Sequence, residues 1–192
     1  MAVDTVHYLH GVSLAGTYLD QITSANFAMG NEYLLVRSSG DPRVYMRSRR
    51  AQKPSLRFST PQIATTLASI GQYGANLSGG NCDLYFRKGT DLGSRQSITA
   101  SEHQRWRGAQ CYGFWSTIRA SHQGDASIDV ELIPTWNGSA NPFVHTGAVP
   151  LSGLLASGDE LFTMGPIFLN GDELPGTQEV SISTGVTPSR RG

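Results

Sequence analysis

The sequence holds few cysteines, few charged residues and no long apolar run. The two cysteines, Cys82 and Cys111, are too few for a disulfide scaffold, and no Cys-x-x-Cys motif is present. We therefore expect both to be buried free thiols in a reducing cytosol. No apolar run approaches the roughly 18 residues that cross a bilayer. The first ten residues also lack the basic and apolar regions of a signal peptide, so we expect no membrane association.

Charge is both scarce and balanced. Charged residues make up 16% of the chain, with 15 basic and 15 acidic side chains and a formal net charge of zero. A general DNA-binding protein needs a basic face, so this composition excludes that class. The balance hides an asymmetry, because residues 121–192 hold two basic and eight acidic residues, a net charge of −6, which leaves +6 for residues 1–120. Such a molecule is able to stack head to tail; charges scattered by chance over solvated loops are the alternative.

The motifs that mark common enzyme sites are missing as well. The chain has no P-loop, no Gly-x-Gly-x-x-Gly and no Gly-x-Ser-x-Gly. His103 and Cys111 lack a third residue to orient and activate them as a base and a nucleophile. His7 and His10 are three residues apart in an expected strand, so they would point to opposite faces and not share a metal. We therefore expect no enzyme, no metal, no cofactor and no small-molecule ligand.

The sequence does contain many glycines, serines and threonines between short alternating segments. Its 22 glycines and low charge indicate many short strands joined by turns. In residues 126–135, Ile128, Val130 and Leu132 would face a core, and the acidic residues between them would face solvent rather than form a catalytic pair. The other expected strands cover residues 5–15 with a turn near Gly11, 22–27, 32–37, 56–58, 82–87, 103–119 as two strands or one bulged strand, 160–170 and 178–184.

One segment, residues 60–71, has the pattern of a helix. Thr60 suits the N-cap and Pro61 suits the first helical position. The apolar residues with helical spacing are Ile63, Leu67 and Ile70. This spacing predicts a short helix that packs one apolar face against a sheet and ends at the glycine that follows.

Together these patterns predict a mainly β protein with one domain over residues 1–192. We expect a β-sandwich or a partial barrel, with the short helix at about 60–71 on its flank and a long projecting loop at about 38–55. No linker divides the chain, and no internal repeat is visible. Residues 186–192 are expected to form a mobile tail.

The expected loop or hairpin at about 38–55 is polar and basic. The basic residues in and just after it are Arg43, Arg47, Arg49, Arg50, Lys53 and Arg57. Docking to an acidic partner surface, contact with phosphate and a solvated hairpin tip all fit this composition. The interleaved aromatic residues of single-strand binders are missing, so we favour docking to a partner protein. The expected subunit or ring interface consists of Arg43, Tyr45, Arg47, Arg49 and Arg50.

The order of elements resembles the phage tail tube (major tail) protein family of long-tailed phages over roughly residues 20–185. The segments that carry the resemblance are SSGDPRVYMRSRRAQKPS, LRFSTPQIATTLASIG, NCDLYFRKGT, ASIDVELIPTWNG, FTMGPIFLNGDELPG and TQEVSISTG. The resemblance implies a virion structural protein with no catalytic residues. It implies a β-sandwich with one flanking helix, whose subunits self-assemble into hexameric rings that stack around a DNA-conducting channel.

The resemblance also implies partners and a location. The long loop would lie between subunits or rings, so the partners are other copies of the chain and other virion tail proteins, with phage DNA in transient passage. The protein would be assembled in the host cytoplasm and reside in the virion tail. A basic loop that faces the lumen and contacts DNA is the alternative.

Other functions fit the same sequence features. A tail terminator, a head–tail adaptor and a capsid decoration protein are close alternatives. A monomeric β-sandwich carbohydrate-binding module is a separate class, in which Trp106, Trp115 and Trp136 would form a platform for sugars. Burial in the core explains these tryptophans equally well.

Overall fold

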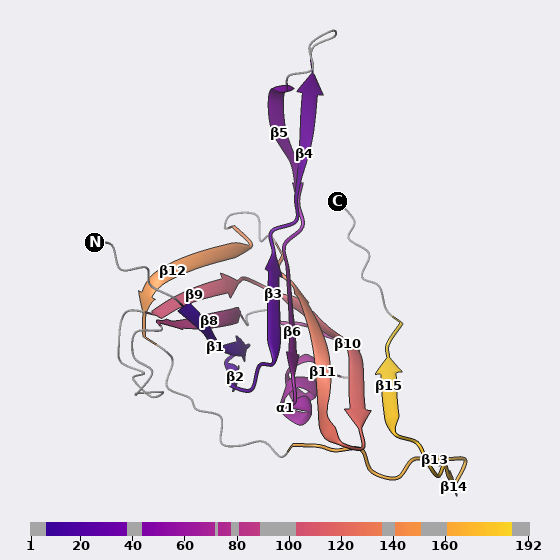
Figure 1. Cartoon of the computed structure of the whole chain (residues 1–192). Coiled ribbons are helices and arrows are strands. Elements are labelled where there is room, and N and C mark those ends of the chain that lie inside the picture. Colours follow the sequence, from indigo (N-terminus) through magenta and orange to yellow (C-terminus); the bar gives the residue numbers. More distant parts are fainter. Residues whose placement is uncertain are drawn as a thin grey trace.

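The protein is described by a computed structural model over residues 7–37, 44–71, 73–77, 81–88, 103–135, 141–150 and 161–185 (Figure 1). Within these residues it is mainly β, with antiparallel sheets in a β-sandwich-like arrangement and one short helix. The predicted fold class is therefore confirmed. The expected tail at 186–192 lies outside the described residues.

Two larger sheets make up the sandwich. The first has the strand order β12-β9-β8-β1-β2, and the second has the order β15-β10-β11-β6-β3, with β7 also paired to β10. The strands of the first sheet are β1 (His7–Leu14), β2 (Thr17–Leu19), β8 (Cys82–Lys88), β9 (His103–Gly108) and β12 (Phe143–Val149). Those of the second are β3 (Ser24–Ala28), β6 (Ser55–Thr60), β7 (Ala75–Asn76), β10 (Tyr112–Ser121), β11 (Gly124–Ile133) and β15 (Glu179–Ser183).

Two small hairpins lie outside these sheets. Their strands are β4 (Asn31–Arg37) with β5 (Val44–Gln52), and β13 (Phe168–Leu169) with β14 (Asp172–Glu173). Figure 1 shows β4–β5 and β13–β14 at opposite ends of the molecule.

The core lies between the two larger sheets. Its buried side chains are Val12, Leu14, Leu19, Leu56, Phe58, Ile70, Leu77, Cys82, Leu84, Cys111, Ile128, Val130, Leu132 and Phe143. The predicted inward face of β11 is confirmed, because its three alternating apolar residues are all at most 2% exposed. One side of the sandwich is closed by aromatic rings from both sheets. Phe27 stacks on Phe143 with ring centroids 4.0 Å apart, and Trp106 lies 5.5 Å from Phe27.

The helix α1 (Ile63–Ile70) packs against strands of both sheets. Ile70 and Thr66 are fully buried, whereas Ile63 and Leu67 are partly buried against the core. The predicted apolar face therefore contacts the core, although less completely at two of its three positions. The N–H of Gly71 donates to the carbonyl of Leu67, so the predicted C-terminal end is confirmed.

The predicted start of the helix is wrong. Thr60 is the last residue of β6, and the N-cap is Gln62, which makes no side-chain capping hydrogen bond. The Thr60 hydroxyl donates to the carbonyl of Gln21 at 2.7 Å and accepts from the Gln62 N–H at 3.2 Å. This hydroxyl ties the end of β6 to a neighbouring segment and to the turn that leads into the helix, from a position before the N-cap.

Two strand predictions also need correction. β1 runs through Gly11 with a bulge, and the chain turns at Ala15 and Gly16, which both have positive φ. Gly11 is instead a place of close packing, because a side chain there would collide with the Tyr18 ring. Residues 161–167 form no strand, and only Phe168–Leu169 of the segment 160–170 is paired. Pro166 lacks the N–H that a paired strand needs.

Candidate functional site

The segment predicted to carry the interface is a strand within a hairpin. β4 and β5 pair with each other, and among the described strands neither pairs with any other. The hairpin extends well beyond the sandwich (Figure 1). The expected projecting loop is therefore a projecting hairpin, which was the alternative reading of this segment. A two-stranded hairpin without a third strand is marginally stable in water. Further contacts along its strands would therefore stabilise it.

Four of the five predicted interface residues lie on this hairpin. They are Tyr45, Arg47, Arg49 and Arg50, whereas Arg43 lies outside the described residues. Arg47 and Arg49 stand in regular register opposite β4, and Tyr45 and Arg50 are the extra residues of two register shifts. Bulges of this kind twist a ribbon and interrupt the pairing pattern along its edge. The backbone thus groups these four residues along one strand.

The base of the hairpin, where it leaves the sandwich, is held by a hydrogen bond and an ion pair. The chain passes from β3 into β4 and returns from β5 into β6, and the two halves meet at Gly30 and Lys53. The N–H of Lys53 donates to the carbonyl of Gly30 at 3.0 Å, and Lys53 pairs with Glu32 at 2.5 Å. Gly30 has a φ of 54°, and a side chain there would collide with the Lys53 carbonyl. Glycine is therefore required where the ribbon leaves the sheet.

A second extension lies at the opposite end of the molecule. We call residues 161–185 the C-terminal arm. None of its side chains is buried. It is held by the pairing of β15 with β10 and by further hydrogen bonds, among them those from the N–H of Ala126 to the carbonyl of Phe162, from the N–H of His122 to the carbonyl of Gln178 and from the N–H of Thr184 to the carbonyl of Ser116. Its large apolar residues that are 43–66% exposed are Leu161, Phe162, Phe168, Leu169, Leu174 and Ile182. A set of exposed apolar side chains on one segment is typical of a contact surface.

The arm also encloses a shallow hollow beside the turn between β10 and β11. Its volume is about 310 Å³. The lining residues that matter here are His122, Met164, Ile167, Glu173, Leu174 and Pro175. The lining combines apolar side chains with polar groups, among them the Glu173 carboxylate, so it can accommodate an apolar side chain with a cation next to it.

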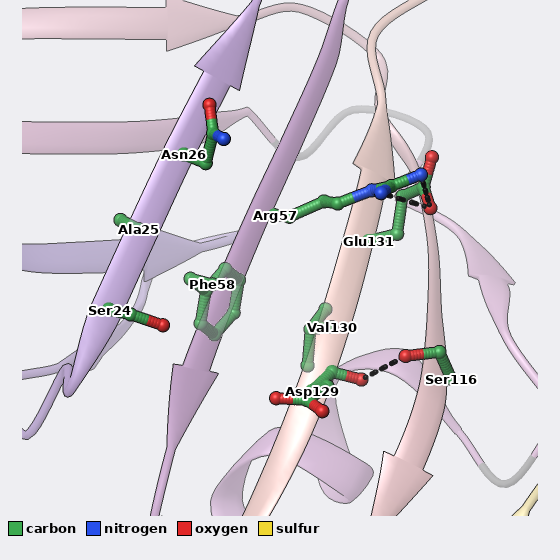
Figure 2. A pocket seen from close by; sticks show the side chains of 9 residues that line it. All are labelled: Ser24, Ala25, Asn26, Arg57, Phe58, Ser116, Asp129, Val130 and Glu131. Atoms are coloured by element: carbon green, nitrogen blue, oxygen red, sulfur yellow. Dashed lines mark hydrogen bonds and ion pairs between the residues drawn. The ribbon is translucent and has the colours of Figure 1, made fainter.

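The outer face of the second sheet carries a different depression, of about 420 Å³ (Figure 2). Arg57 reaches from β6 to Glu131 on β11 at 3.0 Å, and Arg119 on β10 pairs with Asp129 at 3.2 Å. Two of the three carboxylates of β11, those of Asp129 and Glu131, are therefore engaged by arginines on the outer face, as expected for a solvated sheet surface. These pairs join the basic and the acidic halves of the sequence, so on this sheet the charge separation along the chain is not a separation in space.

The outer face of the first sheet holds a buried ion pair that the sequence did not reveal. Asp83 on β8 accepts two hydrogen bonds from Arg107 on β9, each 2.7 Å long, and a third from the Tyr85 hydroxyl at 3.3 Å. Tyr18 lies beside Tyr85 with ring centroids 6.3 Å apart, and burial raises the pKa of its phenol. The cluster is packed and internally paired at its carboxylate, and its side chains come from three strands of the first sheet, β2, β8 and β9.

Both cysteines lie in the core. Cys82 and Cys111 are buried free thiols, as predicted, and burial raises the pKa of Cys111 to about 12 and that of Cys82 well above its usual value. No group of three His, Cys, Asp or Glu side chains in the described part of the chain could hold a metal ion. No helix among the described residues is long and apolar enough to cross a membrane.

The tryptophans bear on the carbohydrate-binding alternative. Trp106 and Trp115 are partly buried and pack against the core, and Trp106 is enclosed by Phe27, Phe143 and His145. Trp136 lies outside the described residues. The two described tryptophans do not present the exposed aromatic platform that a sugar-binding face requires.

The strand predicted over residues 178–184 is confirmed as β15, whereas the sequence holds signals against the strand expected over residues 160–170. Turn pairs interrupt the apolar residues of the arm at Gly165-Pro166, Asn170-Gly171 and Pro175-Gly176. Apolar residues between closely spaced turns cannot alternate over a strand long enough to reach a core.

In comparisons with known proteins, the chain matches no protein-family model and no curated protein sequence.

Proposed function

We propose that this chain is a virion structural protein without enzymatic activity, a subunit of the tail tube of a long-tailed phage. In this proposal copies of the chain self-assemble into stacked rings, hexameric by analogy with the tail tube family, and the stack forms the channel that conducts DNA. The protein is assembled in the host cytoplasm and resides in the virion tail.

The observation that carries the proposal is the β4–β5 hairpin. It projects from a well-packed sandwich, and among the described strands it pairs with no third strand. Three arginines on one strand of such a hairpin would repel one another without acidic neighbours. A partner subunit that supplies acidic and apolar surface stabilises this hairpin, and a ring repeats the contact around its circumference. Since one exposed ion pair is worth about 0–1 kcal/mol, the repetition is what makes the contact strong.

Electron microscopy of the purified protein tests the proposal. Negative staining of concentrated wild-type protein should show rings or tubes, and size-exclusion chromatography should show large species. A protein that remains monomeric at every concentration contradicts the proposal. Single rings that never stack indicate a terminator or an adaptor instead.

Charge reversal on the hairpin separates folding from assembly. The triple variant Arg47→Glu, Arg49→Glu and Arg50→Glu should stay folded as a monomer and lose stacking. The matched control replaces the same three arginines with lysine, which keeps the charge, so stacking should be retained at least in part. Normal tubes from the glutamate variant would make the hairpin a solvated tip, and tubes that assemble but fail to retain DNA would place it in the channel.

A further inference from the structure

The two extensions of the molecule carry opposite charge. The strand β5 holds three arginines and no acidic residue, whereas the C-terminal arm holds three acidic residues and no Lys, Arg or His. The acidic residues of the arm are Asp172, Glu173 and Glu179. Figure 1 shows the β4–β5 hairpin and the β13–β14 part of the arm at opposite ends of the molecule, whereas β15 lies beside β10. The hairpin and the β13–β14 part of the arm cannot meet within one chain, so any contact between them joins two copies.

Their apolar residues are complementary as well. The hollow of the arm has a mixed polar and apolar lining that includes Leu174 and Glu173, and the exposed Phe168 and Leu169 lie on the same small hairpin as Glu173. In β5 the apolar residues Val44 to Met46 come directly before Arg47. An apolar side chain next to a cation is the chemistry that this hollow suits.

We propose that the C-terminal arm of one copy docks onto strand β5 of a second copy, with the hollow of the arm receiving the apolar end of β5 and the acidic residues of the arm facing its arginines. This inference rests on the proposed function, because it identifies the two surfaces that would join successive subunits. The two surfaces differ, so the contact is heterologous and generates a closed ring or an open stack rather than a closed dimer. Salt weakens it only in part, because its apolar component is not screened.

Cysteine cross-linking between two variants tests the contact directly. One variant carries Leu174→Cys in the hollow, the other carries Met46→Cys on β5, and the two are mixed under mild oxidation. The native thiols are buried, so they do not compete. The control partner carries Tyr73→Cys, which is 88% exposed and lies outside the arm. We expect the 46–174 product to form at least about tenfold faster than the 46–73 product, because docking raises the effective concentration of the paired thiols.

The outcomes separate this inference from the proposed function. Equal rates for the two products overturn the docking, and if tubes still form, the tail tube function stands and the arm contacts another surface. A fast 46–174 product without rings or tubes supports the docking and overturns the tail tube function.

A charge exchange adds a second readout. Glu173→Arg should weaken assembly, the control Asp20→Arg at an exposed site outside the arm should not, and Arg47→Glu in the partner copy should restore assembly with Glu173→Arg. Failure of this restoration contradicts the pairing of charges.

Discussion

The sandwich and its two extensions obey different physical rules. In the sandwich, side chains from both sheets are excluded from water, and every strand of the two larger sheets has a hydrogen-bonded neighbour. In the C-terminal arm no side chain is buried, although six large apolar residues are exposed. The comparison teaches that the buried side chains of the monomer come from the sandwich, to which the arm contributes backbone pairing through β15. The exposed apolar side chains of the arm contribute little to folding, so they remain available for contact with other molecules.

Hydrogen exchange should show the largest difference between the two kinds of region. Amides of β10 and β11 should open only by global unfolding, which costs roughly 5–15 kcal/mol in a protein of this type. Amides of β4 and β5 should open with a small fraction of that free energy, because one isolated hairpin is marginally stable. The measurement uses the monomeric hairpin variant with glutamate at positions 47, 49 and 50. Protection of its β4 amides equal to that of β11 would break the comparison.

Truncation of one leucine in each region should give the next largest difference. Leu132 in β11 is fully buried, so Leu132→Ala should lower the free energy of unfolding by about 2–5 kcal/mol. Leu169 in the arm is 66% exposed, so Leu169→Ala should change it by about 0.5 kcal/mol or less. Chemical denaturation of dilute monomer provides both values. A large loss for Leu169→Ala would show that the arm packs on its own sandwich.

The sequence predicted the sandwich better than it predicted the extensions, and the reason is physical. Alternation in β11 and in Cys82–Lys88 follows directly from the period of two in a half-buried strand. Which strand lies beside which depends on contacts between distant parts of the chain. Arg57 and Glu131 are 74 positions apart and are neighbours only because β6 pairs with β11. The charge asymmetry between the sequence halves therefore gave an incomplete picture of the surface.

The interface prediction had a similar limit. A run of arginines after a turn signal correctly indicated a projection, because charged residues at that density cannot enter a core. Whether the projection was a loop or a paired hairpin depended on its register with β4, which two bulges make irregular. The buried Asp83–Arg107 pair was missed for the same reason, since its residues meet only across the β8–β9 register.

Two ion pairs sharpen the comparison further. Asp83 is 5% exposed, and Arg107 is its charged partner. Arg107→Met therefore leaves a buried carboxylate without that partner and should lower the free energy of unfolding by about 2–4 kcal/mol. The loss should be smaller than for a fully buried ion pair, because Arg107 is itself partly exposed. The pair Glu32–Lys53 at the base of the hairpin is half exposed on both sides, so Glu32→Gln should cost at most about 1 kcal/mol. Thermal unfolding of both variants in parallel provides the test. Equal costs would mean that the hairpin joint contributes to the fold as strongly as the sandwich does.

The smallest effect should be a pH dependence that arises in the sandwich and not in the extensions. Burial lowers the pKa of His10 on β1 below its usual value, and the charges of Arg87 and of His103 lower it further, whereas Asp20 raises it. The folded state binds this proton less well than the unfolded state. The free energy of unfolding is therefore undiminished by His10 above about pH 6.5 and decreases as the pH drops below that value. His10→Gln should reduce the fall between about pH 6.5 and 5.

The matched control for this prediction is His122→Gln. His122 is exposed on the turn beside the C-terminal arm, so His122→Gln removes one histidine outside the core and controls for the loss of an imidazole as such. Unfolding midpoints in urea across this pH range supply the slopes. A His10→Gln variant with the wild-type slope would show that protonation of His10 does not oppose folding. A flattened slope for His122→Gln would instead locate the proton-sensitive contact at the base of the arm, where it would couple assembly to pH.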